Sequence, residues 1–156
     1  MAVMAEHRNL FAYVPQGNSL LSGTIRDNLL LADPQATEEQ MRTVLEVAGA
    51  DFVFALPQGI DTMCTEQGGG LSEGQAQRIC IARALLRPCP FMLFDESTSA
   101  LDESTEEGVV QRLVEYCAGR TLIFITHRPA VLYSSSPFGS PGWNIRSSRC
   151  IDFACA

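Results

Sequence analysis

The stretch LSEGQAQRICIARALLRPCPFMLFDESTSALD at residues 71–102 decides the fold. Ser72 is a favourable N-cap, and the apolar positions that follow recur at helical spacing, which predicts a helix to about Leu86. Residues 91–94 are a short apolar run between a proline and an acidic pair, which is typical of a fully buried parallel strand. The stretch therefore predicts a helix that leads into a buried strand.

The neighbouring segments extend this pattern on both sides. Asp102 is the expected N-cap of a helix that Gly119 ends, and residues 121–125 form a second apolar run. Strand, helix and strand in this order indicate an α/β fold with a parallel sheet. Upstream, residues 10–14 predict a strand stopped by a proline, and residues 20–86 are expected to be helical, with one helix starting at Thr37.

Composition narrows the class of protein. The 156 residues are 46% apolar with a formal charge of −7, which suits one domain with a real core and argues against a general nucleic-acid binder. No apolar run approaches the ~20 residues of a membrane-spanning helix, so none is expected in this chain. The six cysteines suggest either a disulfide framework or small buried side chains in a reducing cytosol. The absence of any C-x-x-C pair favours the second interpretation.

Two groups of residues have the side chains that ligand binding or catalysis would need. Ser72 and Gly74 begin a predicted helix, where backbone N–H groups and the helix dipole favour a phosphate, although a plain capped helix would have the same sequence. Asp95 and Glu96 end a buried strand, where one carboxylate can hold Mg²⁺ and the other can orient or deprotonate water. His127 follows the next strand, where parallel sheets place their active-site loops. The alternatives are a surface acidic pair and a structural histidine.

Taken together, these residues resemble the ABC ATPase family. LSEGQ at 71–75 is similar to the family signature LSGGQ, with Glu73 in place of a glycine. The other matching motifs occur in the order that the family has. They are the Q-loop at 13–16, an exporter-type stretch at 22–28, the Walker B strand with its glutamate at 91–96, the D-loop at 99–102 and the switch histidine at 125–128.

The resemblance implies a role for each matching residue. Glu96 would be the general base, Asp95 would support Mg²⁺, and Gln16 would contact Mg²⁺ or the attacking water. His127 would contact the γ-phosphate of ATP. Ser72, Gly74 and Gln75 of the signature, with Asp102 of the D-loop, would act on ATP held by a second nucleotide-binding domain.

The resemblance also implies an organisation of the chain. We expect a partial P-loop NTPase (RecA-like) core of parallel strands at residues 1–19 and 87–133. The ABC α-helical subdomain, which meets the coupling helices of a transmembrane domain, would occupy 20–86. Residues 134–156 match nothing in the family, and their Ser, Pro and Gly content predicts a disordered tail. Such a module works at the cytoplasmic face of a membrane through its transmembrane partner.

One family motif is missing from the sequence. All eleven cations are arginine, so the 156 residues contain no lysine and no G-x-x-x-x-G-K-[ST] phosphate-binding loop. We therefore expect a fragment of an exporter ATPase that does not hydrolyse ATP alone. A non-catalytic module that supplies LSEGQ to an intact partner is the alternative. An ABC ATPase of the DNA-repair or chromosome-organising kind would require coiled-coil segments or basic patches, and the sequence has neither.

Overall fold

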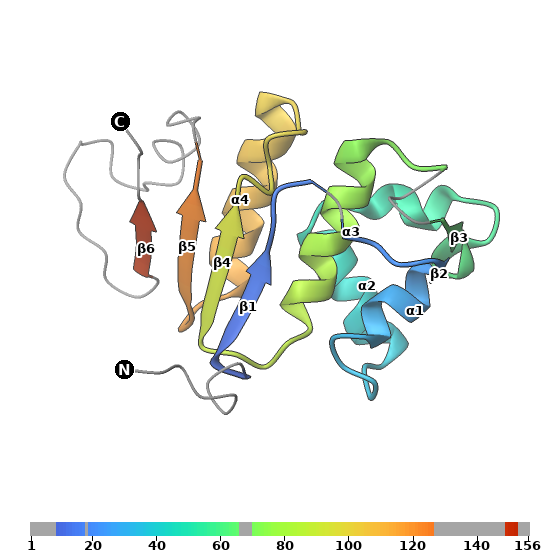
Figure 1. Cartoon of the computed structure of the whole chain (residues 1–156), viewed down its shortest axis with the longest axis horizontal. Coiled ribbons are helices and arrows are strands. Elements are labelled where there is room, and N and C mark those ends of the chain that lie inside the picture. Colours follow the sequence, from blue (N-terminus) through green and yellow to red (C-terminus); the bar gives the residue numbers. More distant parts are fainter. Residues whose placement is uncertain (1–8, 18, 66–69, 127–148, 153–156) are drawn as a thin grey trace.

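The computed structural model describes residues 9–17, 19–65, 70–126 and 149–152. A four-stranded sheet has the order β1-β4-β5-β6, and every neighbouring pair is parallel. Its strands are β1 (Phe11–Val14), β4 (Phe91–Asp95), β5 (Thr121–Ile125) and β6 (Arg149–Asp152). Figure 1 shows them side by side, with α4 behind the sheet and the other helices beyond β1. The parallel sheet predicted from the buried apolar runs is confirmed.

Four α-helices accompany the sheet: α1 (Ile25–Leu30), α2 (Glu38–Val47), α3 (Glu73–Leu85) and α4 (Glu103–Tyr116). Two 3₁₀ turns, η2 (Asp51–Ala55) and η3 (Gly59–Asp61), follow α2. The predicted helical stretch also contains a small antiparallel ladder between β2 (Gly23–Thr24) and β3 (Met63–Cys64). No helix in the described part of the chain is long and apolar enough to span a bilayer.

Side-chain caps explain where the helices begin. Thr24, Thr37 and Ser72 each accept a hydrogen bond from the backbone N–H three residues on, and each forms a complete capping box. Asp102 caps α4 in the same way, without the reciprocal bond. A hydroxyl or carboxylate at this position satisfies one of the free N–H groups of the first turn. The N-caps predicted at Thr37, Ser72 and Asp102 are confirmed.

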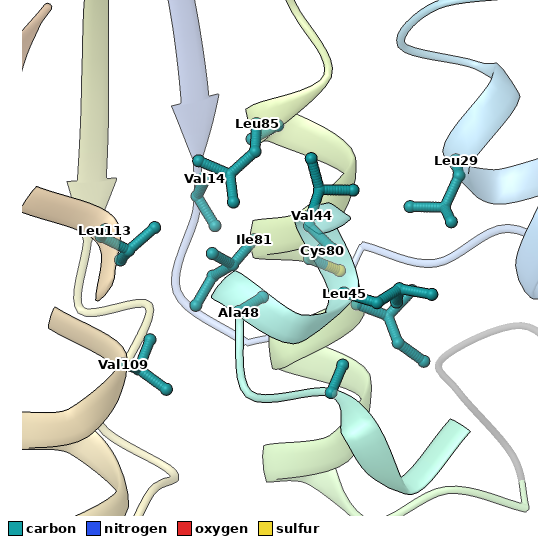
Figure 2. Close-up of a cluster of buried hydrophobic side chains, with 14 of the residues drawn as sticks. Val14, Leu29, Val44, Leu45, Ala48, Cys80, Ile81, Leu85, Val109 and Leu113 are labelled. Carbon is teal, nitrogen blue, oxygen red and sulfur yellow. The ribbon is translucent and has the colours of Figure 1, made fainter. Parts of the chain in front are cut away.

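One hydrophobic core joins the helices to a single face of the sheet. Figure 2 shows Val14 of β1 pointing toward Ile81 and Leu85 of α3, with Val109 and Leu113 of α4 beside this cluster. Four cysteines lie in this core as free thiols, which agrees with small buried side chains at these four positions: Cys64, Cys80, Cys89 and Cys117. The structure does not describe the other two cysteine side chains.

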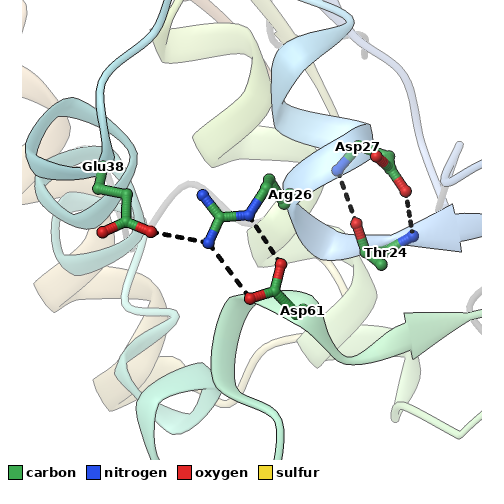
Figure 3. Close-up of polar contacts among 5 residues, drawn as sticks. All are labelled: Thr24, Arg26, Asp27, Glu38 and Asp61. Atoms are coloured by element: carbon green, nitrogen blue, oxygen red, sulfur yellow. Dashed lines mark hydrogen bonds and ion pairs between the residues drawn. The ribbon is translucent and has the colours of Figure 1, made fainter.

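A surface network fixes the helices outside the core. Arg26 of α1 donates from Nε to Asp61 of η3 at 2.7 Å and from Nη2 to Glu38 of α2 at 2.8 Å. Figure 3 shows this guanidinium between the two carboxylates, next to the capping box of Thr24. The two carboxylates raise the pKa of the Arg26 guanidinium, and in return the pKa of Asp61 is lowered. One cation therefore ties three separate elements together.

The expected disorder at residues 134–156 is wrong for four of them. Residues 149–152 form β6, which pairs with β5 in parallel from Thr121↔Arg149 to Phe124↔Asp152. The outer edge of β5 presents backbone N–H and C=O groups that need partners, and a short strand supplies them. Residues 127–148 and 153–156 lie outside the described part of the chain.

Candidate functional site at the carboxyl edge of the sheet

The carboxyl ends of β1, β4 and β5 meet at one edge of the sheet because the three strands are parallel. Val14 pairs with Phe94, and Asp95 pairs with Ile125. Gln16, two residues beyond β1, therefore lies near the acidic pair at the end of β4. This edge is where open α/β sheets bind their ligands.

Two consecutive carboxylates at this edge are each hydrogen-bonded to the segment that contains β1. The Tyr13 hydroxyl donates to Asp95 Oδ2 at 2.9 Å. The Gln16 amide donates from Nε2 to Glu96 Oε2 at 3.0 Å. The structure thus brings together three residues predicted for the site, Gln16, Asp95 and Glu96, and adds Tyr13.

Glu96 occupies a strained backbone position. Its φ is +44°, which makes it the one non-glycine residue with positive φ in the described part of the chain. Its N–H donates to the Ile125 carbonyl at 2.8 Å, and its own carbonyl accepts from Gln77 Nε2 at 3.3 Å and Ser99 Oγ at 2.8 Å. Such a conformation costs about 1–3 kcal/mol and persists only where the surroundings enforce it. Here β5, α3 and the following loop enforce it together.

The oxygen ligands at this edge suit a weakly bound Mg²⁺ whose coordination is completed mostly by water. Asp95 and Glu96 offer hard carboxylate oxygens, which Mg²⁺ prefers. Within the described ranges, no group of three or more His, Cys, Asp and Glu side chains could hold a metal ion. This matches Mg²⁺ sites that use one or two carboxylates and complete their coordination with water and substrate phosphates.

The start of α3 forms the second part of the candidate site. Ser72 Oγ accepts from the Gln75 N–H at 3.2 Å, while Gln75 Oε1 accepts from the Ser72 N–H at 2.9 Å. Ser72 is exposed, and its hydroxyl hydrogen is still available to a ligand. The remaining free N–H groups of the first turn and the dipole favour an anion here. Glu73, exposed in the same turn, leaves the cap intact.

Gly74 brings the D-loop against this helix start. A Cβ at Gly74 would lie 3.0 Å from the Ala100 carbonyl oxygen and 3.3 Å from Leu101 Cδ2. The Ala100 carbonyl therefore lies where a side chain at residue 74 would begin. Asp102, at the end of the same loop, accepts from the Thr105 N–H and hydroxyl and from the Ser104 hydroxyl. These bonds lower the pKa of Asp102 to about 2, so it is an anion at neutral pH.

A cavity of about 280 Å³ lies between the sheet and the helices. Its lining includes Tyr13 and Pro15 at the end of β1, Leu31 after α1, and Arg83 and Arg87 of α3. The guanidinium of Arg83 donates to the carbonyl and hydroxyl oxygens of Ser19, at 3.0 and 2.6 Å. The cavity therefore adjoins the segment that carries Gln16.

The structure locates most of the predicted site residues, and it adds two that sequence reasoning missed. His127 lies outside the described residues. Gln77 is fully buried and anchors the Glu96 carbonyl. A polar residue four positions before Ile81, on the buried face of α3, was the signal that could have revealed it. Tyr13 gave no such signal, because its contact with Asp95 depends on the strand register.

Comparisons with known proteins identify the family of this chain. The family model described as ABC transporter matches residues 2–99. The exotoxin translocation ATP-binding protein PaxB of Pasteurella aerogenes is 47% identical over 122 residues, and the leukotoxin translocation ATP-binding protein LktB of Mannheimia haemolytica is 45% identical. Each match covers 78% of this chain and 17% of the relative.

A solved structure adds the three-dimensional match. The structure of a bacterial Atm1-family ABC exporter with ATP bound aligns with a TM-score of 0.75 at 37% identity. The alignment covers 81% of this chain and 22% of the exporter chain. The chain therefore belongs to the ABC transporter family, and its sheet and helices form part of a P-loop NTPase α/β fold.

Proposed function

We propose that this chain is the catalytic and coupling part of the ATP-binding module of an ABC exporter. The observation that supports this most directly is the convergence of Gln16, Asp95 and Glu96 at the carboxyl edge of the sheet, with a 3.0 Å hydrogen bond from Gln16 to Glu96. The relatives are longer polypeptides, of which this chain covers 17%. The module would act at the cytoplasmic face of a membrane, beside its transmembrane partner.

In this proposal, the residues at the edge divide the work. Glu96 accepts the proton of the water that attacks the γ-phosphate, and Gln16, already bonded to Glu96, orients that water. Asp95 supports Mg²⁺, which neutralises phosphate charge when it is bound. His127 contributes a further contact to the γ-phosphate. The hydrogen bond from Gln16 gives the Glu96 carboxylate a defined direction.

The start of α3 would act on a second site. Ser72, Gly74 and Gln75 form an anion-binding helix start whose cap uses neither carboxylate of the acidic pair. Facing a second nucleotide-binding domain, this surface would contact the γ-phosphate of the ATP held there. Asp102, held as an anion at the end of the D-loop, would act across the same interface.

The helices between residues 20 and 86 would be the α-helical subdomain that meets the transmembrane partner. The cavity of about 280 Å³ supports this role, because it opens between α3 and the segment that carries Gln16. A coupling helix seated there would contact the elements that position both Gln16 and Ser72. Transport and hydrolysis would thereby be linked.

ATP binding in this proposal requires additional polypeptide. The 156 residues contain no lysine, whereas the phosphate-binding loop of these ATPases uses one. The sheet face that carries Phe11, Tyr13 and Leu93 is exposed or half-exposed, although both faces of parallel sheets are ordinarily covered. A strand–loop–helix unit with the missing lysine would pack on this face.

A chimera tests the proposal. Residues 9–156 would be joined to a segment that contains G-x-x-x-x-G-K-[ST] from an ABC ATP-binding domain, and phosphate release would be measured with Mg²⁺ and ATP. We expect hydrolysis that falls by about 10²–10⁴-fold in Glu96→Gln. The control Glu39→Gln, exposed on α2, should retain full activity. Equal activity of Glu96→Gln and the parent chimera would refute the assignment of the base.

A non-catalytic role is the second candidate, and one observation favours it. The capped start of α3 is formed without any contribution from a phosphate-binding loop. The chain could therefore complete the site of an intact partner. Adding the chain to an intact ABC ATP-binding domain should then raise the ATPase activity of that domain, and Ser72→Arg should abolish the effect. Unchanged activity on adding the parent chain would count against this role.

A further inference from the structure

Tyr13, near the carboxyl edge of the sheet, has no role assigned to it by the family motifs. Its side chain is 53% exposed, so burial does not account for its orientation. The hydroxyl nevertheless reaches Asp95, 82 positions away in the sequence, at 2.9 Å. Tyr13 pairs with Leu93 in the sheet register, which places Tyr13 and Asp95 on the same face at a diagonal spacing. The register of β1 against β4 therefore sets this contact.

The contact distinguishes the two carboxylate oxygens of Asp95, because only one of them accepts a hydrogen bond from Tyr13. Oδ2 accepts the phenolic hydrogen, while Oδ1 receives no hydrogen bond from Tyr13. A carboxyl group at the end of a strand otherwise rotates over a broad range of χ2. A donor on one oxygen fixes the plane of the carboxylate and thus the direction of the other oxygen.

Gln16 and Glu96 form a similar donor–carboxylate pair, one residue further along the chain from Asp95. Gln16 bonds to Glu96 just as Tyr13 bonds to Asp95, so the segment 13–16 orients both carboxylates of the acidic pair. Residues that hydrogen-bond to a metal-ligating carboxylate orient it, and their loss typically costs about 10–100-fold in metal affinity. Tyr13 hydrogen-bonds to Asp95, the proposed metal-ligating carboxylate, in this way.

We propose that Tyr13 is a positioning residue for the Asp95 carboxylate, which it holds with one oxygen directed to a divalent cation. This inference rests on the proposed role of Asp95 in supporting Mg²⁺. It predicts that Tyr13→Phe weakens cation binding at Asp95 without unfolding the chain. A tyrosine with only a packing role would change stability and leave cation binding as it was.

Manganese titration followed by NMR tests this on the chain as it exists. Mn²⁺ stands in for Mg²⁺, and paramagnetic broadening of the Asp95 and Glu96 amide signals detects even weak binding. Four chains are compared: the parent, Tyr13→Phe, Asp95→Asn and the control Tyr116→Phe. Tyr116 ends α4 and is also partly exposed, at 40%. Thermal unfolding of all four chains is recorded alongside.

We expect the parent and Tyr116→Phe to titrate alike, with Tyr13→Phe requiring about tenfold more Mn²⁺. Loss of broadening in Asp95→Asn would locate the cation at Asp95 whatever Tyr13→Phe does, so the metal role and the Tyr13 role are judged separately. Titration of Tyr13→Phe within twofold of the parent, or tighter, would overturn the inference. So would absence of broadening at Asp95 in the parent.

Discussion

The helical part of the chain (residues 20–65 and 70–86) and the sheet differ in how fully their own residues cover them. In the helical part, Leu29, Leu45 and Ile79 are completely buried, and capping boxes begin all three α-helices. The sheet has one face buried against helices, while Phe11 and Tyr13 on the other face are 46% and 53% exposed. The proposed catalytic residues lie at the edge of this half-covered sheet.

This difference bears on the two ATP sites proposed above. The helix start at Ser72 is formed within the well-covered part, where the proposal has it act on a partner. The acidic pair at Asp95 and Glu96 borders the half-covered face, where the proposed phosphate-binding segment would pack. Among the described residues, the helices of the signature region therefore pack into a buried core, whereas one sheet face beside the acidic pair is exposed.

The largest expected effect is a difference in the stability lost when a leucine is replaced in each of the two regions. Leu45→Ala, in α2, should lower the free energy of unfolding by about 2–5 kcal/mol, because it leaves a cavity in a closed core. Leu93→Ala, on the half-exposed sheet face, should cost less than about 1 kcal/mol, since water already reaches that side chain. Urea denaturation of both variants measures the difference. Equal losses would mean that the sheet face is covered after all.

Gly74 joins the two regions, and its replacement should have the next largest effect. A Cβ there would meet the Ala100 carbonyl at 3.0 Å, and such overpacking costs about 1–3 kcal/mol. Gly108→Ala in α4 is the control, since its Cβ would meet only Arg112 Nη1 at 3.6 Å. That variant should be stabilised by about 0.4–1 kcal/mol. A destabilised Gly108→Ala would remove the steric explanation.

Two N-caps with the same geometry, compared by mutation, show whether Ser72 acts only as a cap or also in ATP hydrolysis. Ser72→Ala and Thr37→Ala should each cost about 1 kcal/mol of stability, because each removes an N-cap of the same kind. In the P-loop chimera, only Ser72→Ala should also lower ATP hydrolysis. If both variants lowered hydrolysis equally, Ser72 would have no role beyond capping α3.

The smallest expected effect is on the stability of the chain at low pH. The pKa of Asp102 is lowered to about 2 from the ordinary 3.8 by its bonds to Thr105 and Ser104. A lowered folded-state pKa contributes stability above the unfolded pKa, and this is lost as pH falls through the folded value. The advantage of the parent over Asp102→Asn in melting temperature should therefore be constant above pH 5 and vanish between about pH 4 and 2. A difference independent of pH would contradict this.

The sequence was sufficient for the main helices and strands, but not for the short strands β2, β3 and β6 or for the contacts between elements. Apolar runs at 91–94 and 121–125 predicted strands, and Ser72, Thr37 and Asp102 predicted helix starts, because these signals are local. The bonds from Tyr13 to Asp95 and from Gln77 to the Glu96 carbonyl depend on strand register and helix packing, which no local pattern encodes. The pairing of β6 was missed for the same reason: four residues gain a strand partner only where β5 offers a free edge.

The central claim is that this chain holds catalytic and signature residues but depends on another segment to bind ATP. Calorimetric titration of the 156-residue chain with Mg²⁺ and ATP tests it most directly. The account predicts a dissociation constant weaker than ~1 mM, which corresponds to less than about 4 kcal/mol of binding free energy. The chimera with the phosphate-binding segment should bind in the micromolar range. Micromolar binding by the chain alone would contradict the account.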